Sequence, residues 1–195
     1  SSELPPIFNF LSFTLNLYIA ENGYQFLFFL VFLWSISVEE QFYIFWGIIL
    51  NTASKINAKF FQFSIPVTAM LLIAISLWYR HIHSHNELKL YFHTLSVTAN
   101  FGIGILLAYL SAYNKWFVPL IQQMSKLSIV FLMLILILSV STYTIVFTHP
   151  IAILFERVYF SFLFAIIIAV LCYSSIIPSL QKFFHPFDYL GKIAL

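Results

Sequence analysis

The stretch that decides the fold is WSISVEEQFY, residues 34–43, which lies inside one of the longest apolar runs of the chain. Two neighbouring acids, Glu39 and Glu40, interrupt a segment that otherwise has the composition of a membrane interior. A charged side chain near the centre of a bilayer costs about 2.5 to 3.5 kcal/mol on insertion scales. Such residues usually face the interior of a helix bundle or an aqueous cavity, so the two acids are candidates for function.

The composition indicates an integral membrane protein. Of the 195 residues, 62% are hydrophobic and only 8% are charged, whereas a soluble domain carries about 25% charged residues. A net charge of +2 without a basic cluster gives no reason to expect a nucleic-acid partner. Cys172 is the single cysteine, which excludes a disulfide within the chain.

Apolar stretches long enough for spanning helices recur along the chain. A helix needs about 20 mostly apolar residues to cross a bilayer. Five stretches qualify or come close, and residues 7–20 could be the end of one more. The five are 24–50, 62–79, 95–113, 127–147 and 157–177. We therefore predict an all-α, polytopic transmembrane helix bundle of about five to six spanning helices, forming one membrane-embedded domain over residues 1–195.

Lysine and arginine predict how this bundle is oriented, because cytoplasmic loops carry an excess of both. The first, third and fifth loops hold six of these residues, and the second and fourth hold three. The six are Lys55, Lys59, Lys115, Lys126, Lys182 and Lys192, and the three are Arg80, Lys89 and Arg157. The bias predicts that the odd loops are cytoplasmic, in a multi-pass protein that contacts membrane lipid.

The residues around the two acids allow two interpretations. Ser35, Glu39 and Tyr43 follow one another at intervals of four, so they share one face of a helix, and Glu40 lies about 100° away. This favours a functional carboxylate at Glu39. Alternatively, Ser37 followed three residues later by Glu40 matches a capping box, and the acids would then mark the start of a helix.

Three stretches, in the same order, resemble the acyltransferase family 3 membrane proteins. WSISVEEQFY is very similar to the W-S-L-x-V-E-x-Q-F-Y signature of that family. YFHTLSVTANFGIGILLAYL, residues 91–110, looks like its helix with a polar start and a G-x-x-L-A-Y run. YLGKIAL, residues 189–195, looks like the start of its L-G-K-I-S segment. The resemblance covers roughly residues 10 to 195.

Members of this family have about ten helices and move acetyl or other short acyl groups onto hydroxyls of sugars and other envelope molecules. The resemblance implies a place in the bacterial inner membrane. It also implies acyl-CoA, chiefly acetyl-CoA, as the donor substrate, a carbohydrate or glycolipid acceptor, and no bound cofactor. It makes Glu39 the constant acid of the motif, which orients a basic partner or accepts a hydrogen bond from the acceptor. The implied substrate-binding residues are Trp34, Ser35, Gln41, Tyr43 and Asn100.

The family also carries a histidine on its first helix and an arginine-rich segment near its third, and neither has a counterpart here. The chain begins at Ser1 and ends directly after an apolar turn. We therefore expect a piece of a longer protein, without the first and last helices of the family and inactive alone. The alternative functions are a transporter or flippase-like protein that uses Glu39 as a proton or substrate site, and a structural subunit in which Glu39 tolerates apolar replacement.

Other polar positions have simpler explanations. HIHSH, residues 81–85, could bind a metal if the chain is extended, and Glu87 is near. We expect a polar surface loop instead, since no third ligand is evident. His93 and Asn100 frame a polar entry to the stretch 95–113, which is either a capped, partly hydrated helix end or one wall of the acceptor cavity. Gly102 and Gly104 would permit close helix packing. Glu156 and Arg157 suggest a local ion pair.

Overall fold

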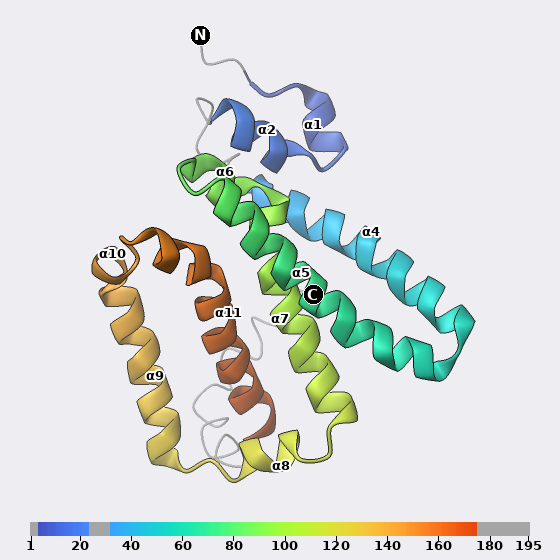
Figure 1. The fold of residues 1–195 in the computed structure, drawn as a ribbon, viewed down its shortest axis with the longest axis vertical. Helices are drawn as coiled ribbons and strands as arrows, with labels where there is room; N and C mark the ends of the chain where they lie inside the picture. Colours follow the sequence, from blue (N-terminus) through green and yellow to red (C-terminus); the bar gives the residue numbers. More distant parts are fainter. Residues whose placement is uncertain (1–3, 24–31, 175–195) are drawn as a thin grey trace, which may run out of the picture.

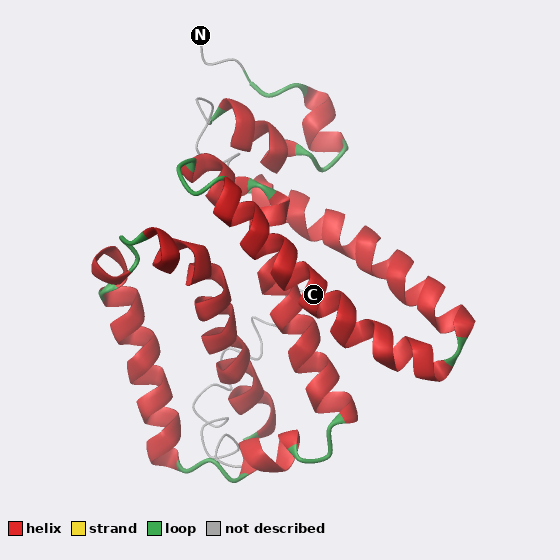
Figure 2. Cartoon of the chain, viewed as in Figure 1, coloured by secondary structure: helices red, strands yellow, loops and turns green. Residues whose placement is uncertain are grey.

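A computed structural model describes residues 4–23 and 32–174 of the chain. Within those ranges every regular element is a helix (Figures 1 and 2). The short helices are α1 (Ile7–Leu11), α2 (Leu15–Asn22), α6 (Glu87–Phe92), α8 (Phe117–Gln122) and α10 (Tyr143–Val146). The longer ones are α4 (Leu33–Ile56), α5 (Ala58–Ile82), α7 (Thr94–Tyr113), α9 (Lys126–Ser141) and α11 (Pro150–Tyr173). The predicted all-α helical bundle is confirmed.

Polar side chains determine where several of these helices begin. The side chain of Asn57 accepts a hydrogen bond from the backbone N–H of Phe60 and caps α5. His93 Nδ1 accepts from Leu95 at the start of α7, and His149 Nδ1 accepts from Ile151 at the start of α11. A side chain in this position satisfies one of the N–H groups that the first turn of a helix leaves without a partner.

The core of the bundle is the pair α5 and α7, which pack against each other more extensively than any other helices. Gly102 lets them approach closely, because a Cβ at this position would lie 2.7 Å from the carbonyl oxygen of Ala69. Two buried hydroxyls also join the pair. Ser76 donates to the carbonyl of Ser96 at 2.7 Å, and Thr98 donates to that of Leu72 at 2.9 Å. Small residues and hydroxyls are the usual means by which membrane helices associate.

The other helices surround this pair. Helix α4 runs along α5, whereas α11 packs against α7 and contacts α5 and α9 (Figure 1). Helix α2 lies across the start of α4 and against α6. The N-terminal ends of α4, α7 and α11 therefore gather at the same end of the bundle as the C-terminal end of α5. We call this the α6 end. The turn between α4 and α5 and the segment around α8 lie at the opposite end, which we call the α8 end.

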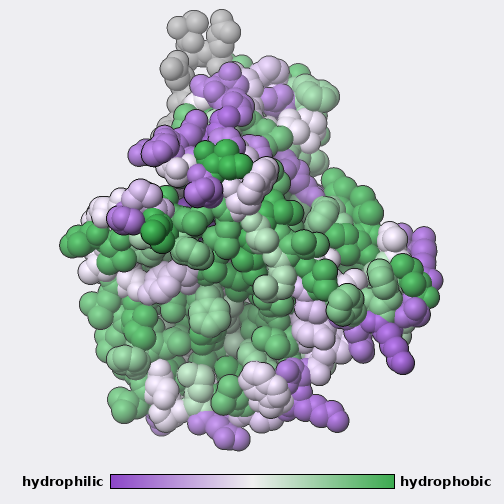
Figure 3. Space-filling view, in the orientation of Figure 1, coloured by the Kyte–Doolittle hydropathy of each residue, from purple (hydrophilic) through white to green (hydrophobic). Residues whose placement is uncertain are grey.

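The chain is a membrane protein. Among the described residues three segments, 58–82, 87–113 and 150–173, are long and apolar enough to cross a bilayer, and α9 is a shorter apolar helix. Figure 3 shows a broad hydrophobic surface between hydrophilic patches at the α6 end and the α8 end. The lysines predicted to be cytoplasmic at positions 55, 59, 115 and 126 all belong to the α8 end, whereas those at 182 and 192 lie outside the described residues.

The predicted stretches correspond to these helices with some changes. Stretch 62–79 lies within α5 and stretch 95–113 within α7. Stretch 127–147 is divided into α9 and α10. Helix α11 begins seven residues earlier than predicted, because His149 caps it and Pro150 occupies its first position. Helix α4 is not among the three spanning segments, since its acids lower its hydropathy, and residues 24–31 lie outside the described residues.

Two predictions near the N-terminus were wrong. Residues 7–20 are not the end of one spanning helix, because the chain breaks at Phe13, whose φ is 53°, and divides into α1 and α2. The capping box at Ser37 is not formed either. Helix α4 is continuous from Leu33, and Ser37 donates to the carbonyl of Leu33 inside it at 3.1 Å. Glu39 and Glu40 are therefore in the body of a helix and not at its start.

Candidate functional site

A cavity of about 900 Å³ lies at the α6 end of the bundle. Its walls come from the start of α4, the end of α5, α6 and the segment from α10 into α11. Ionisable side chains from separate parts of the chain meet there with the first residues of the WSISVEEQFY motif. The residues used below are Trp34, Ser35, Arg80, His85, Glu156 and Arg157.

Arg80 is the most deeply buried charge of the site, with 2% of its surface exposed. Its Nη2 lies 3.0 Å from Oε2 of Glu156 in α11, which forms an ion pair. Its other donors reach the carbonyls of Leu90, Ile153 and Leu154 and the hydroxyl of Ser96. A buried arginine is tolerated when its charge is paired and its N–H groups are bonded. Arg80 therefore ties α5, α6, α7 and α11 together at this end.

Arg157 follows Glu156 in α11 but has different partners. Its guanidinium carbon lies 5.3 Å from the centre of the Tyr91 ring in α6, within the range of a cation–π interaction. Its Nε is enclosed, and among the described residues it has no hydrogen-bond partner. The predicted local ion pair between Glu156 and Arg157 is wrong, because Glu156 faces Arg80 across the helix interface.

The first two residues of the motif lie on the wall of this cavity. The ring of Trp34 packs at 5.4 Å from the ring centres of Tyr91 and Phe92, so α4 is held against α6. Ser35 donates to the backbone carbonyl of Phe32 at 3.0 Å. Trp34 and Ser35 were predicted as substrate-binding residues, and both are at a place where a ligand could reach them.

Gln41 is the next polar residue of the motif after the two acids, and its side chain belongs to a network of hydrogen bonds between helices. Its Nε2 donates to Oδ1 of Asn16 at 2.9 Å and to the carbonyl of Phe13, while its Oε1 accepts from the hydroxyl of Thr94 at 2.6 Å. Asn16 is fully buried and donates to Thr94 Oγ1 and to the carbonyl of Phe92. The network joins α2, α4 and the start of α7. Gln41 therefore fixes the position of α4 beside the cavity.

The remaining predicted residues are elsewhere. Glu39 is exposed on α4, one turn beyond Ser35 and on the same face, and Tyr43 is 58% exposed a further turn along. Asn100 accepts a hydrogen bond from Ser161 of α11 at 2.7 Å and lines a separate, mostly apolar cavity of about 480 Å³. Trp34 and Ser35 thus line the cavity at the α6 end, whereas Asn100 lines a different one.

The polar residues at the start of α7 mostly serve packing. Thr94 belongs to the Gln41 network, and Ser96 and Thr98 bond to backbone groups of the neighbouring helices. His93 caps the helix, as one of the two interpretations predicted. In the part of the chain that the structure describes, no three side chains of His, Cys, Asp or Glu are arranged to hold a metal ion.

Arg80, Arg157 and Asn16 are the residues of this region that the sequence did not reveal. Arg80 was counted only as a loop charge, and Arg157 as a loop charge and as the partner of Glu156 in a local ion pair. The available signal was that each borders a long apolar run, where an ionisable residue is a candidate for function. Nothing in the local sequence could show that Arg80 and Glu156, far apart in the chain, lie opposite each other.

No protein-family model, no curated protein and no solved structure matches the chain.

Proposed function

We propose that this protein is a multi-pass inner membrane acyltransferase module that transfers an acyl group, chiefly acetyl, from acyl-CoA to a hydroxyl of an envelope carbohydrate or glycolipid. The proposal rests first on the similarity of residues 34–43 to the signature of acyltransferase family 3. The observation that supports it most is the position of that motif, since Trp34 and Ser35 line a cavity that also contains paired and unpaired charges.

The predicted orientation gives this cavity a role. If the lysine-rich α8 end is cytoplasmic, the cavity at the α6 end opens toward the envelope. An envelope glycan could then reach it, whereas acyl-CoA would approach from the other face. The cavity would be the acceptor site, and its volume of about 900 Å³ is within the usual range for ligand pockets.

The chemistry requires that a hydroxyl oxygen attack the thioester carbonyl. A C–O bond forms, the C–S bond breaks, the hydroxyl proton passes to a base, and the CoA thiolate leaves and is protonated. In this proposal the carboxylate of Glu39 accepts the hydrogen bond of the acceptor hydroxyl or orients the basic group that takes its proton. Glu39 is exposed one turn from Ser35, so a group in the cavity mouth could approach it.

The test is acyl transfer by membranes that contain the protein expressed from its own gene. Labelled acetyl-CoA is supplied, and labelled ester in the envelope glycan fraction is measured for the wild type and for Glu39→Gln. We expect Glu39→Gln to lose about 100-fold or more of the transfer rate, because acid–base groups contribute about 10²- to 10⁴-fold.

Glu40→Gln is the matched control, since it removes the same charge from the next residue of the same helix. Glu40→Gln should keep near wild-type transfer. Normal transfer by Glu39→Gln at normal abundance would refute the role of Glu39. Loss of proton-coupled transport in Glu39→Gln, without any acyl transfer in the wild type, would favour the transporter alternative.

A further inference from the structure

The cavity at the α6 end contains a cation whose charge is not balanced by its neighbours. Arg80 and Glu156 neutralise each other through their 3.0 Å contact. Arg157 forms no ion pair with a described carboxylate, and its enclosed Nε has no acceptor among the described residues. A buried donor without a partner is costly unless something else supplies an acceptor.

The geometry around Arg157 suits an oxyanion. The Tyr91 ring supports one face of the guanidinium at 5.3 Å. A guanidinium that stacks on a ring still directs its N–H donors outward in its own plane, where they match the oxygen spacing of a phosphate or carboxylate. Glu87 is the other carboxylate of the wall, and it is exposed at the start of α6 without an ion pair to Arg157.

The other residues of the wall, and the level of the cavity relative to the membrane, indicate what kind of molecule contains that oxyanion. Ser84 and His85 add polar groups, whereas Leu88, Phe147 and Ile153 add apolar surface, so the cavity has both characters. It lies at the ends of spanning helices beside aromatic rings, and aromatic residues mark the level of the lipid headgroups. Its volume far exceeds that of a phosphate group, which leaves room for part of an amphiphile.

We propose that this cavity binds the phosphate group of an anionic amphiphile, with Arg157 as the residue that contacts the phosphate oxygens. Arg80 and Glu156 hold the wall in place, and Tyr91 fixes the plane of the guanidinium. The apolar side of the cavity receives the first part of the hydrocarbon chain. This binding does not depend on acyl transfer, so it stands or falls separately from the proposed enzyme activity.

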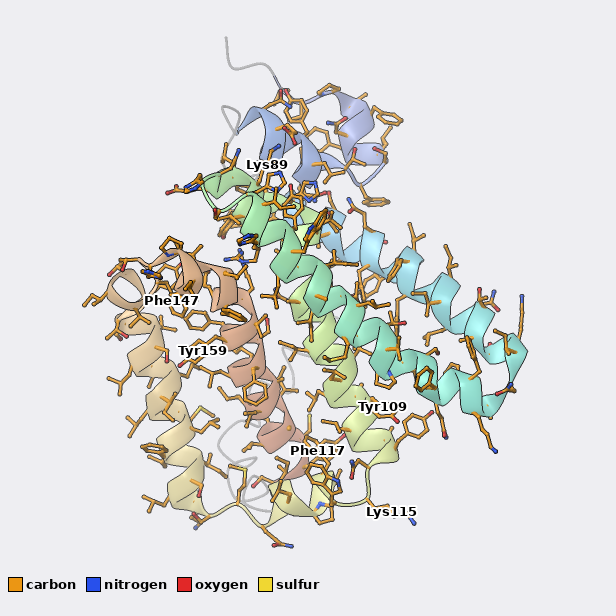
Figure 4. The ribbon with its side chains drawn as sticks, viewed as in Figure 1. Lys89, Tyr109, Lys115, Phe117, Phe147 and Tyr159 are labelled. Carbon is orange, nitrogen blue, oxygen red and sulfur yellow. The ribbon has the colours of Figure 1, made fainter. Side chains whose placement is uncertain are left out.

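The experiment measures lipid binding by the full protein in phosphatidylcholine nanodiscs. Short-chain phosphatidic acid, short-chain phosphatidylcholine and inorganic phosphate are titrated separately, and the thermal unfolding midpoint gives an apparent Kd for each. The variants are Arg157→Gln, which removes the charge, and Arg157→Lys, which keeps the charge without the planar fork. Lys115→Gln is the matched control, because Figure 4 places Lys115 at the opposite end of the helices from Phe147, which lines the cavity.

We expect phosphatidic acid to raise the midpoint saturably in the wild type and in Lys115→Gln, and phosphatidylcholine to have no such effect. Arg157→Gln should bind phosphatidic acid about tenfold or more weakly, which is the loss of one charge-assisted contact, and Arg157→Lys should fall between. If Arg157→Gln does not fold, the weaker binding of Arg157→Lys alone tests the role of the fork.

Two results would overturn the proposal. Wild-type affinity for phosphatidic acid in both Arg157 variants would show that the phosphate binds elsewhere. Equal affinity of the wild type for inorganic phosphate and phosphatidic acid would assign the site to a soluble anion and refute the amphiphile. Because no acyl donor is present in the assay, neither result bears on the activity of Glu39.

Discussion

Substituting the two glycines of α7 tests the packing of the bundle. In Gly102→Ala the new Cβ would lie 2.7 Å from the carbonyl oxygen of Ala69 and 2.8 Å from Cγ1 of Ile73. Both distances are shorter than contact distance, and the first involves backbone, so α5 and α7 must move apart. At Gly104 a new Cβ meets no atom within 4 Å. The two variants make the same chemical change on the same helix, two residues apart.

The expected magnitudes follow from two opposing effects. Replacing a helical glycine with alanine favours the helix by about 0.5 to 1 kcal/mol in both variants. Overpacking costs about 1 to 3 kcal/mol, and only Gly102→Ala incurs that cost. Gly104→Ala should therefore be neutral or slightly stabilised, and the free energy of unfolding of Gly102→Ala should be lower than that of Gly104→Ala by about 1 to 3 kcal/mol.

The assay is unfolding of each purified variant in mixed micelles, in which the fraction of an anionic detergent is increased and helix content is followed. The midpoint of Gly102→Ala should fall below that of the wild type, and Gly104→Ala should not. Equal midpoints for the two variants would refute the close approach of α5 and α7 at Gly102. A lower midpoint for Gly104→Ala alone would show that the packed face of α7 is assigned incorrectly.

Three further outcomes are expected. Gln41→Ala should lower the free energy of unfolding by about 1 to 3 kcal/mol, because it leaves Oδ1 of the buried Asn16 without its Gln41 donor and the hydroxyl of Thr94 without its Gln41 acceptor. Glu40→Gln should have little effect in the same micelle assay. Nζ of Lys89 donates a hydrogen bond to Oε1 of Glu21 at 2.9 Å, and this bond holds the pKa of Glu21 below its ordinary value near 4.5. The contact therefore stabilises the docking of α2 on α6 fully at pH values above the ordinary pKa, and this stabilisation is lost as the pH falls through the lowered pKa. Hydrogen exchange in α2 should accelerate on acidification in the wild type and much less in Lys89→Met. The predicted orientation places the loop between α5 and α6 on the envelope side and the turn between α4 and α5 in the cytoplasm. A reporter enzyme that works only in the periplasm should therefore be active when fused into the first and inactive when fused into the second. Activity at both positions would contradict the predicted orientation.

The sequence predicted the helices whose signals are local. The limits of α7 were within one residue of the structure because His93 supplies a cap and a long apolar run follows. Helix α11 was predicted too late, since the charges of Glu156 and Arg157 looked like a membrane boundary. In the structure both lie inside the helix, where Glu156 forms an ion pair with Arg80 and Arg157 stacks on the ring of Tyr91. Local composition could not reveal partners that are more than sixty residues away.

The site illustrates the same limit. The motif singled out α4, and Trp34 and Ser35 do line the cavity. The helical periodicity correctly grouped Ser35, Glu39 and Tyr43 on one face, but it could not tell which face would be covered. The covered face is the one that contains Gln41, because the amide of Gln41 forms hydrogen bonds to α2 and α7. The face with Glu39 and Tyr43 is therefore left exposed. Arg80 and Arg157 entered the site through tertiary packing alone.

The most direct test of acyl transfer compares envelope glycans from four strains: cells that carry the gene, cells that lack it, and cells that lack it but express either Glu39→Gln or Glu40→Gln. Mass spectrometry of the intact glycans reports ester-linked acyl groups, and mild base treatment removes them. We predict an acyl ester that is present with the wild-type gene, absent without it, and not restored by Glu39→Gln although Glu40→Gln restores it. Identical glycans in all four strains would contradict the proposal that this membrane protein is an acyltransferase.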